Sequence, residues 1–265
     1  MDLKSSASSP HIQLLLTEVI AISKSAGKEI LNIYQQDFSV ETKSDSSPLT
    51  EADLASHKLI CSKLKSLTPD IPIISEESCD IEWEVRSKWN KYWLIDPLDG
   101  TKEFIKKNGE FTVNIALISD GVPILGVVYA PVLETCYYGA QEMGSWKQQS
   151  NDECFSIQVK KNFTGTVLKV MGSRSHQSQE FKSYIQQLEP YELASMGSSL
   201  KLCLIAEGKA DIYPRLGPTS EWDTAAAHAV VKYAGGECLN YETNKELMYN
   251  QKESLLNPYF IVKGF

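Results

Sequence analysis

The chain has 265 residues, 42% hydrophobic and 23% charged, a balance that supplies ample apolar material for a core. Its formal net charge of −8 argues against a general nucleic-acid binder, which needs a basic surface, but allows a small phosphorylated substrate in a local pocket. The longest uncharged apolar stretch, 121–133, is too short for a bilayer, which takes roughly 20 residues. Six scattered cysteines form no C-x-x-C pair, so we expect free thiols in a reducing, cytoplasmic compartment.

The N-terminal region predicts two helices after a short polar leader that lacks a signal-peptide cleavage site. Apolar residues recur at helical spacing over five turns, which is typical of a long amphipathic helix: Leu15, Val19, Ile22, Ala26, Ile30 and Ile33. Thr50 precedes Asp53 by three residues, the spacing of a capping box. We therefore expect a second helix that begins there and runs to about Leu67.

After the second helix the pattern changes to short apolar runs separated by Gly and Pro. These runs predict strands at 71–74, 92–95, 111–118, 122–129 and 135–138, with an antiparallel meander in the later ones. The segment 142–165 is polar and poorly periodic. We place a domain boundary there, which gives an N-terminal α+β half, 1–160, that would hold the metal-binding and catalytic residues.

The C-terminal half, 161–265, alternates strands with helices, which is the pattern of an α/β fold. Strands are expected near 167–171, 191–194, 211–213 and 237–239, and helices near 179–188, 199–207 and 224–234. Taken together, the chain predicts an α+β half joined to an α/β half.

An apolar strand ends in two carboxylates, Asp96 and Asp99, separated by a Pro-Leu turn. One interpretation is an ordinary tight turn, because Pro-x-Asp-Gly is good turn chemistry. The other is a site for a hard divalent ion such as Mg²⁺, with the Leu98 carbonyl as a third oxygen ligand. Gly100 and Thr101 would then offer backbone N–H groups to a phosphate at a helix start.

Other carboxylates also stand at the ends of predicted elements. Glu76 and Glu77 follow a short strand, Asp53 begins a helix, and Asp223 precedes another helix. Each has an ordinary explanation, as a solvated loop residue or a helix cap. Together they place carboxylates at four separate element ends, as a multi-metal site built from distant segments requires.

Three motifs at these positions resemble the lithium-sensitive, Mg²⁺-dependent phosphatases related to inositol monophosphatase. They are Asp-Pro-Leu-Asp-Gly-Thr at 96–101, Ser-Glu-Glu at 75–77 and Glu-Trp-Asp at 221–223. Further segments resemble the 3′(2′),5′-bisphosphate nucleotidase branch, nearest to its bacterial sulfate-assimilation members: 43–53, 99–106, 197–201 and 213–218. The resemblance spans nearly the whole chain and implies a layered αβαβα sandwich.

The resemblance also implies a role for each matching residue. Glu76, Asp96 and the Leu98 carbonyl match the ligands of one Mg²⁺ ion. Asp96, Asp99 and Asp223 match the ligands of a second. Such a pair of ions binds the attacking and leaving oxygens of a phosphoryl transfer.

A third, weaker ion would depend on Asp53 or on waters near Glu76 and Glu77. Asp45 and Thr101 match the pair that orients and deprotonates the attacking water. Thr101 alone is a poor base, and a hydrogen bond to Asp45 would make its oxygen a competent proton acceptor.

Substrate recognition is expected mainly from the C-terminal half. His176, Ser198, Lys201 and Arg215 match nucleotide-contacting positions, and the two cations suit a 5′-phosphate that does not react. Without the resemblance, these would be ordinary surface cations, a loop histidine and a helix-capping serine. The same resemblance adds substrate contacts at Glu76, Leu98, Asp99, Gly100, Thr101 and Asp223.

The leading hypothesis is therefore Mg²⁺-dependent hydrolysis of the 3′-phosphate of adenosine 3′,5′-bisphosphate to AMP and phosphate, with 3′-phosphoadenylyl sulfate as a further substrate. The alternatives are an inositol or sugar monophosphatase and, from another class, a catalytically silent nucleotide or metal sensor. The expected partner is a small molecule rather than a nucleic acid. Weak peripheral attachment to the inner membrane stays open beside a cytoplasmic location.

Overall fold

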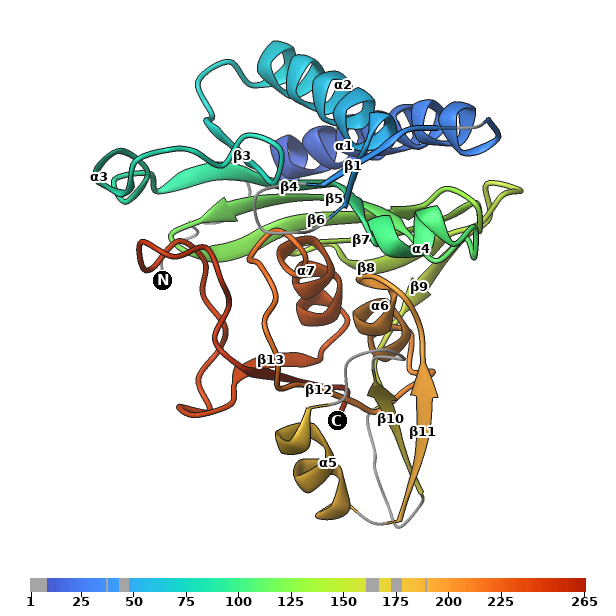
Figure 1. Ribbon diagram of the computed structural model, residues 1–265. Coiled ribbons are helices and arrows are strands. Elements are labelled where there is room, and N and C mark those ends of the chain that lie inside the picture. The colour runs from blue at the N-terminus through green and yellow to red at the C-terminus, as the bar shows by residue number, and fades with distance from the viewer. Residues whose placement is uncertain (1–8, 37, 43–47, 161–166, 173–177, 189) are drawn as a thin grey trace.

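The computed structural model describes residues 9–36, 38–42, 48–160, 167–172, 178–188 and 190–265. Figure 1 shows helices and sheets stacked in five alternating layers, as expected for an αβαβα sandwich. The outer helices α1 and α2 cover one sheet, α6 and α7 lie between the sheets, and α5 covers the second sheet. Their bounds are α1 Ser9–Tyr34, α2 Glu51–Leu67, α5 Gln179–Gln186, α6 Leu200–Ala206 and α7 Ala225–Tyr233.

The first sheet has seven strands in chain order, from β3 at one edge to β9 at the other. β3 and β4 are parallel, and every later neighbour is antiparallel, so the predicted meander is confirmed. The strands are β3 Ile73–Ser75, β4 Lys91–Asp99, β5 Thr112–Ser119, β6 Val122–Ala130, β7 Thr135–Ala140, β8 Gly144–Gln148 and β9 Cys154–Ile157.

The last two strands of this sheet correct the sequence analysis, which placed no strand between 142 and 165. β8 pairs with β7, and β9 pairs with β8 at the sheet edge. Three of the four residues of β9 are exposed, so the strand lacks the apolar alternation that marks a half-buried strand. The division at 160/161 stays a prediction, and residues from both sides of it share the core between the sheets.

The second sheet has the order β11-β10-β12-β14-β13. β10 runs parallel to β11 and β12, whereas β14 is antiparallel to both of its neighbours. The predicted α/β alternation is present, and β14 at the chain end was not predicted. The strands are β10 Leu168–Gly172, β11 Tyr191–Ser195, β12 Ile212–Arg215, β13 Glu237–Asn240 and β14 Phe260–Lys263.

Side chains of β4 alternate between the two cores. Trp93 and Ile95 pack towards α1 and α2, whereas Tyr92 and Leu94 pack in the core that α6 and α7 share. Helix α7 lies very close to this sheet. A Cβ atom at Gly126 on β6 would be 2.2 Å from the Ala226 carbonyl oxygen on the helix. The packing therefore brings the start of α7 to the end of β4.

The remaining elements are short. They are β1 Val40–Thr42, β2 Pro48–Thr50, α3 Trp83–Arg86 and α4 Thr101–Ile105. The predicted capping box begins α2, where the Thr50 amide donates to Asp53 Oδ2 at 2.8 Å. No helix among the described residues is long and apolar enough to cross a membrane.

Candidate active site

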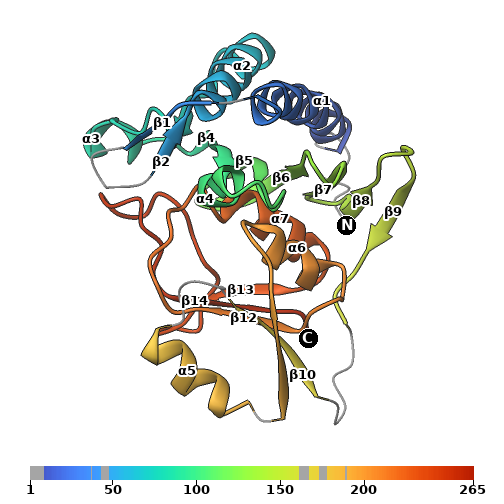
Figure 2. The same ribbon diagram turned by 45° about the vertical axis from the view of Figure 1, so that its right-hand side comes forward.

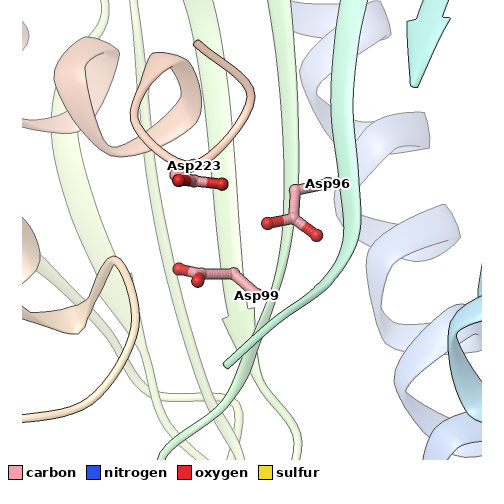
Figure 3. Close-up of side chains that lie close together, drawn as sticks. All are labelled: Asp96, Asp99 and Asp223. Atoms are coloured by element: carbon pink, nitrogen blue, oxygen red, sulfur yellow. The ribbon is translucent and has the colours of Figure 1, made fainter. Parts of the chain in front are cut away.

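Three aspartates predicted as metal ligands meet in space. Asp96 and Asp99 come from the end of β4, and Asp223 comes from the turn before α7 (Figure 3). One carboxylate oxygen of each lies within 4.8 Å of the others. The two segments are separated by more than a hundred residues, so packing rather than local sequence assembles the group.

The local sequence of β4 fixes the first two carboxylates. The Leu98 amide donates to Asp96 Oδ1 at 3.0 Å, and Ser56 on α2 donates to the Pro97 carbonyl at 2.8 Å. Gly100 follows with φ 94°, a left-handed conformation that glycine adopts without steric cost. The chain thus turns from β4 into α4 while Asp99 faces Asp223.

The negative charges of this cluster are unfavourable unless a cation is bound. Burial raises the pKa of Asp96 well above its usual range, and Glu76, Asp99 and Asp223 add to the rise. A side-chain hydrogen bond joins Glu76 to Asp96, so the fourth predicted carboxylate belongs to the same cluster. Withdrawal from water likewise raises the pKa of Asp223, and Asp99 and Glu76 add to it. Hard carboxylate oxygens crowded in this way fit a divalent ion such as Mg²⁺.

Asp99 also links β4 to the loop that begins α6. Its Oδ2 accepts hydrogen bonds from Ser198 Oγ at 2.6 Å and from the Ser199 amide at 2.7 Å. Ser198 has φ 54°, which is uncommon for a residue with a side chain. Its hydroxyl, predicted to contact the substrate, is therefore engaged with a predicted metal ligand.

The Thr101 hydroxyl lies beside the carboxylate of Asp53. Thr101 Oγ1 donates to Asp53 Oδ1 at 3.3 Å and lies 3.4 Å from the Leu98 carbonyl oxygen. The other oxygen of Asp53 caps α2 through Thr50. Asp45, the partner expected for Thr101, lies outside the described residues, and so does His176.

A cleft of about 380 Å³ is lined by Asp99 and Asp223 and also by the predicted substrate residues Ser198, Lys201 and Arg215. Lys201 Nζ donates to the carbonyls of Met196 at 3.1 Å and Ser198 at 2.6 Å. Arg215 Nη2 donates to the Pro218 carbonyl at 2.6 Å. The Arg215 Nε atom is buried and has no hydrogen-bond partner among the described residues. Acidic and basic side chains thus line the same cleft.

Several further residues of the cleft were not singled out from the sequence. Lys102 and Lys106 on and just after α4 line it, and so do Tyr213 and Phe260 from the second sheet. The Lys201 Nζ lies 5.6 Å from the centre of the Tyr213 ring. The four-residue spacing of the two lysines, directly after Thr101, is the signal that would have found them.

Comparison with protein families matches residues 12–261 of this chain to the inositol monophosphatase family. The chain belongs to the inositol monophosphatase family. A relative from Salmonella typhimurium, the 3′(2′),5′-bisphosphate nucleotidase CysQ, is 50% identical over 250 residues, which are 94% of this chain and 99% of that protein. The enzyme of the same name from Haemophilus influenzae is 40% identical and covers 94% of this chain and 93% of that protein.

Solved structures of the inositol monophosphatase family agree with the fold. CysQ from Bacteroides thetaiotaomicron superposes with a TM-score of 0.83 at 39% identity, over 95% of this chain and 97% of that one. The Thermotoga maritima IMPase gives a TM-score of 0.74 at 24% identity, over 93% of this chain and 90% of that one. The αβαβα sandwich expected from the sequence is therefore confirmed.

Proposed function

We propose that this protein is a Mg²⁺-dependent 3′(2′),5′-bisphosphate nucleotidase that hydrolyses the 3′-phosphate of adenosine 3′,5′-bisphosphate to AMP and phosphate. The observation that carries the proposal is the cleft, which brings clustered carboxylates together with Lys201 and Arg215. A substrate with two phosphates fits a cleft that offers both a metal site and two cations. Half of the residues match enzymes that carry this name, over nearly the full length of both chains.

The carboxylates would hold the metal. Glu76, Asp96 and the Leu98 carbonyl would bind one Mg²⁺, and Asp96, Asp99 and Asp223 a second. Asp53 or waters near Glu76 and Glu77 would serve a third. When bound, the metal supplies charge neutralisation for the phosphate and a lowered pKa for the attacking water.

The chain's own residues would orient the water and accept its proton. Thr101 Oγ1 would accept the proton of the water. A carboxylate would in turn accept the proton that the hydroxyl itself carries. Asp45 is proposed for that role. The contact of 3.3 Å between Thr101 Oγ1 and Asp53 Oδ1 makes Asp53 a second candidate for the same role.

The cations of the cleft would recognise the substrate. Lys201 and Arg215 would hold the phosphate that does not react. His176 would contact the nucleotide, and Ser198 would contact it from the loop that Asp99 holds. Gly100 also lines the cleft and would offer a backbone amide there.

Phosphate release with Mg²⁺ tests the proposal. Adenosine 3′,5′-bisphosphate should be the best substrate when it is compared with 3′-phosphoadenylyl sulfate, inositol 1-phosphate and AMP. A higher kcat/KM for inositol 1-phosphate would favour the monophosphatase alternative. Binding of Mg²⁺ and nucleotide without phosphate release would favour the silent sensor.

Two further properties belong to the same proposal. Li⁺ is expected to inhibit by replacing one divalent ion, because a monovalent ion stabilises developing negative charge less. A cytoplasmic location agrees with the six cysteines, which form no disulfide in the described part of the structure. The alternative of peripheral membrane attachment gains no support from the described residues.

A further inference from the structure

Arg86 on α3 is a buried cation, with 3% of its surface exposed. Its guanidinium donates to the Asn250 side-chain oxygen, to the Glu253 carbonyl and, at 3.3 Å, to the Lys252 carbonyl. The Asn250 side chain donates back to the Arg86 carbonyl at 2.7 Å. Figures 1 and 2 show the red loop between β13 and β14 passing close to α3, which is where these contacts form.

The same loop holds the segment that carries Asp223. The backbone amide of Asn250 donates to Glu221 Oε2 at 2.8 Å. The backbone amide of Glu221 donates to the Leu255 carbonyl at 2.8 Å. Asn257 donates to the Ser220 carbonyl at 2.7 Å. The loop therefore binds the chain on the N-terminal side of Asp223, and Arg86 attaches this loop to α3.

Helix α3 belongs to the connection between β3 and β4, which begins with Glu76. The connection returns directly into the strand that carries Asp96. The two ligand-bearing regions are thus joined twice, once by the packing of α7 on the sheet and once through Arg86 and Asn250. The second link joins the two segments that supply Glu76 and Asp223.

We propose that Arg86 and Asn250 are positioning residues, which act through Glu221 to hold Asp223 at the separation from Glu76 and Asp96 that metal binding requires. The inference rests on the proposed metal site. Glu221 is 2% exposed, so its carboxylate is enclosed within this link rather than solvated.

The composition of the link favours this role over plain stabilisation. Arg86 Nε is buried without a hydrogen-bond partner among the described residues, so the arrangement leaves one donor unsatisfied. Apolar residues of similar volume often stabilise a core as well as buried charged groups do. A directional network of charge-assisted bonds instead fixes one geometry.

Direct measurement of Mg²⁺ binding by isothermal titration calorimetry tests the proposal. Partners that orient metal ligands typically contribute about 10–100-fold in affinity. We expect Arg86→Lys and Asn250→Ala each to weaken Mg²⁺ binding by about that factor. Glu221→Gln keeps an oxygen to accept from the Asn250 amide, so it should bind Mg²⁺ more tightly than Glu221→Leu.

Lys147→Met provides the matched control. Lys147 makes an ion pair with Glu207 at 2.9 Å, its side chain is 13% exposed, and it does not line the cleft. This variant also removes an enclosed cation and should lower the melting temperature while Mg²⁺ affinity stays at the wild-type value. Equal loss of affinity in Lys147→Met would mean general destabilisation and would overturn the proposal.

Failure of the proposed function gives a different result. If wild-type protein binds no Mg²⁺, the metal site itself is wrong and the positioning role goes with it. If the wild type binds Mg²⁺, Asp96→Asn does not, and both Arg86→Lys and Asn250→Ala bind normally, the site stands and the positioning role is wrong. Asn250→Ala keeps the buried arginine in place, so it decides the matter if Arg86→Lys fails to fold.

Discussion

The acidic and the basic residues of this region are positioned in different ways. The acidic set centres on Asp96, 1% exposed at the end of a central strand, where burial and the neighbouring carboxylates disfavour its charged form in the absence of a cation. The basic set consists of Lys201 and Arg215, which are partly exposed and donate to backbone carbonyls a few residues away in the chain. The chemistry would thus depend on buried, mutually repelling carboxylates, whereas substrate choice would depend on partly exposed cations held by nearby carbonyls.

The largest effect is expected in the acidic set. Asp96→Asn keeps the shape of the side chain but removes a charge from the proposed ligand of both ions. Because changes beyond the ligands already cost about 10–100-fold, kcat/KM should fall by more than 100-fold at saturating Mg²⁺. The melting temperature without Mg²⁺ should not fall, since the repulsion is relieved. Normal turnover of Asp96→Asn, measured as phosphate release, would contradict the role of Asp96 as a metal ligand.

The next effect concerns the water-orienting hydroxyl. Thr101→Val removes the hydroxyl, and loss of a general base typically costs about 100-fold or more in kcat. Asp45→Asn and Asp53→Asn separate the two candidate partners. The true partner should add little further loss in the double variant with Thr101→Val, because groups that act as a unit are not additive. Multiplicative losses in both doubles would mean that Thr101 works without either carboxylate.

A smaller effect is expected in the basic set. Two N–H donors of Lys201 already serve the Met196 and Ser198 carbonyls, which leaves one for a phosphate. Lys201→Ala should therefore raise KM for adenosine 3′,5′-bisphosphate by about 10-fold, the value of one charge-assisted bond. KM for 3′-AMP should change far less.

Lys182→Ala on α5 is the matched control, because Lys182 is exposed and does not line the cleft. An unchanged ratio of kcat/KM between the bisphosphate and 3′-AMP in Lys201→Ala would contradict the assignment of the basic set.

The smallest effect isolates burial from the charges of the cleft. His228 lies on α7, is 1% exposed, and its ring faces the Tyr249 hydroxyl at 3.0 Å. Burial lowers the pKa of His228 in the folded protein below its usual 6.5. The unfolded chain therefore binds a proton first, so stability falls as the pH drops below about 6.5.

Melting temperatures between pH 7.5 and 5.5 check this, at about 2–4 °C for each kcal/mol lost. His228→Gln should flatten the dependence relative to the wild type. An equally steep dependence in that variant would assign the loss to other groups.

The sequence predicts that the carboxylates lie close together, because each stands where a recognisable element ends. Asp96 and Asp99 follow an apolar strand, and Asp223 precedes a helix, so element ends alone suggest that they meet. Hydrogen bonds between distant segments have no such local signal. The contacts of Asp99 with Ser198 and of Asp53 with Thr101 depend on packing angles that no spacing in the chain encodes.

The fold also has parts with a local signal in the sequence and parts without one. The long helix and the meander have strong periodicity, and both are present. The edge strand β9 was missed because its exposed residues carry no apolar alternation. Arg86 was also missed, because a buried arginine reads in sequence like any surface cation, and only its partners around Asn250 distinguish it.

The close approach of α7 to the sheet has a consequence for natural variation in this gene. A methyl group at Gly126 would lie 2.2 Å from the Ala226 carbonyl oxygen. That oxygen belongs to the backbone and cannot turn aside like a side chain, so the helix itself would have to move. Ala226 lies one helical turn after Asp223, and the aspartate would be carried away from its partners on β4. We expect Gly126→Ala to be a loss-of-function allele although it alters no cleft residue, so inventories of active-site residues would miss a class of inactivating changes in the core.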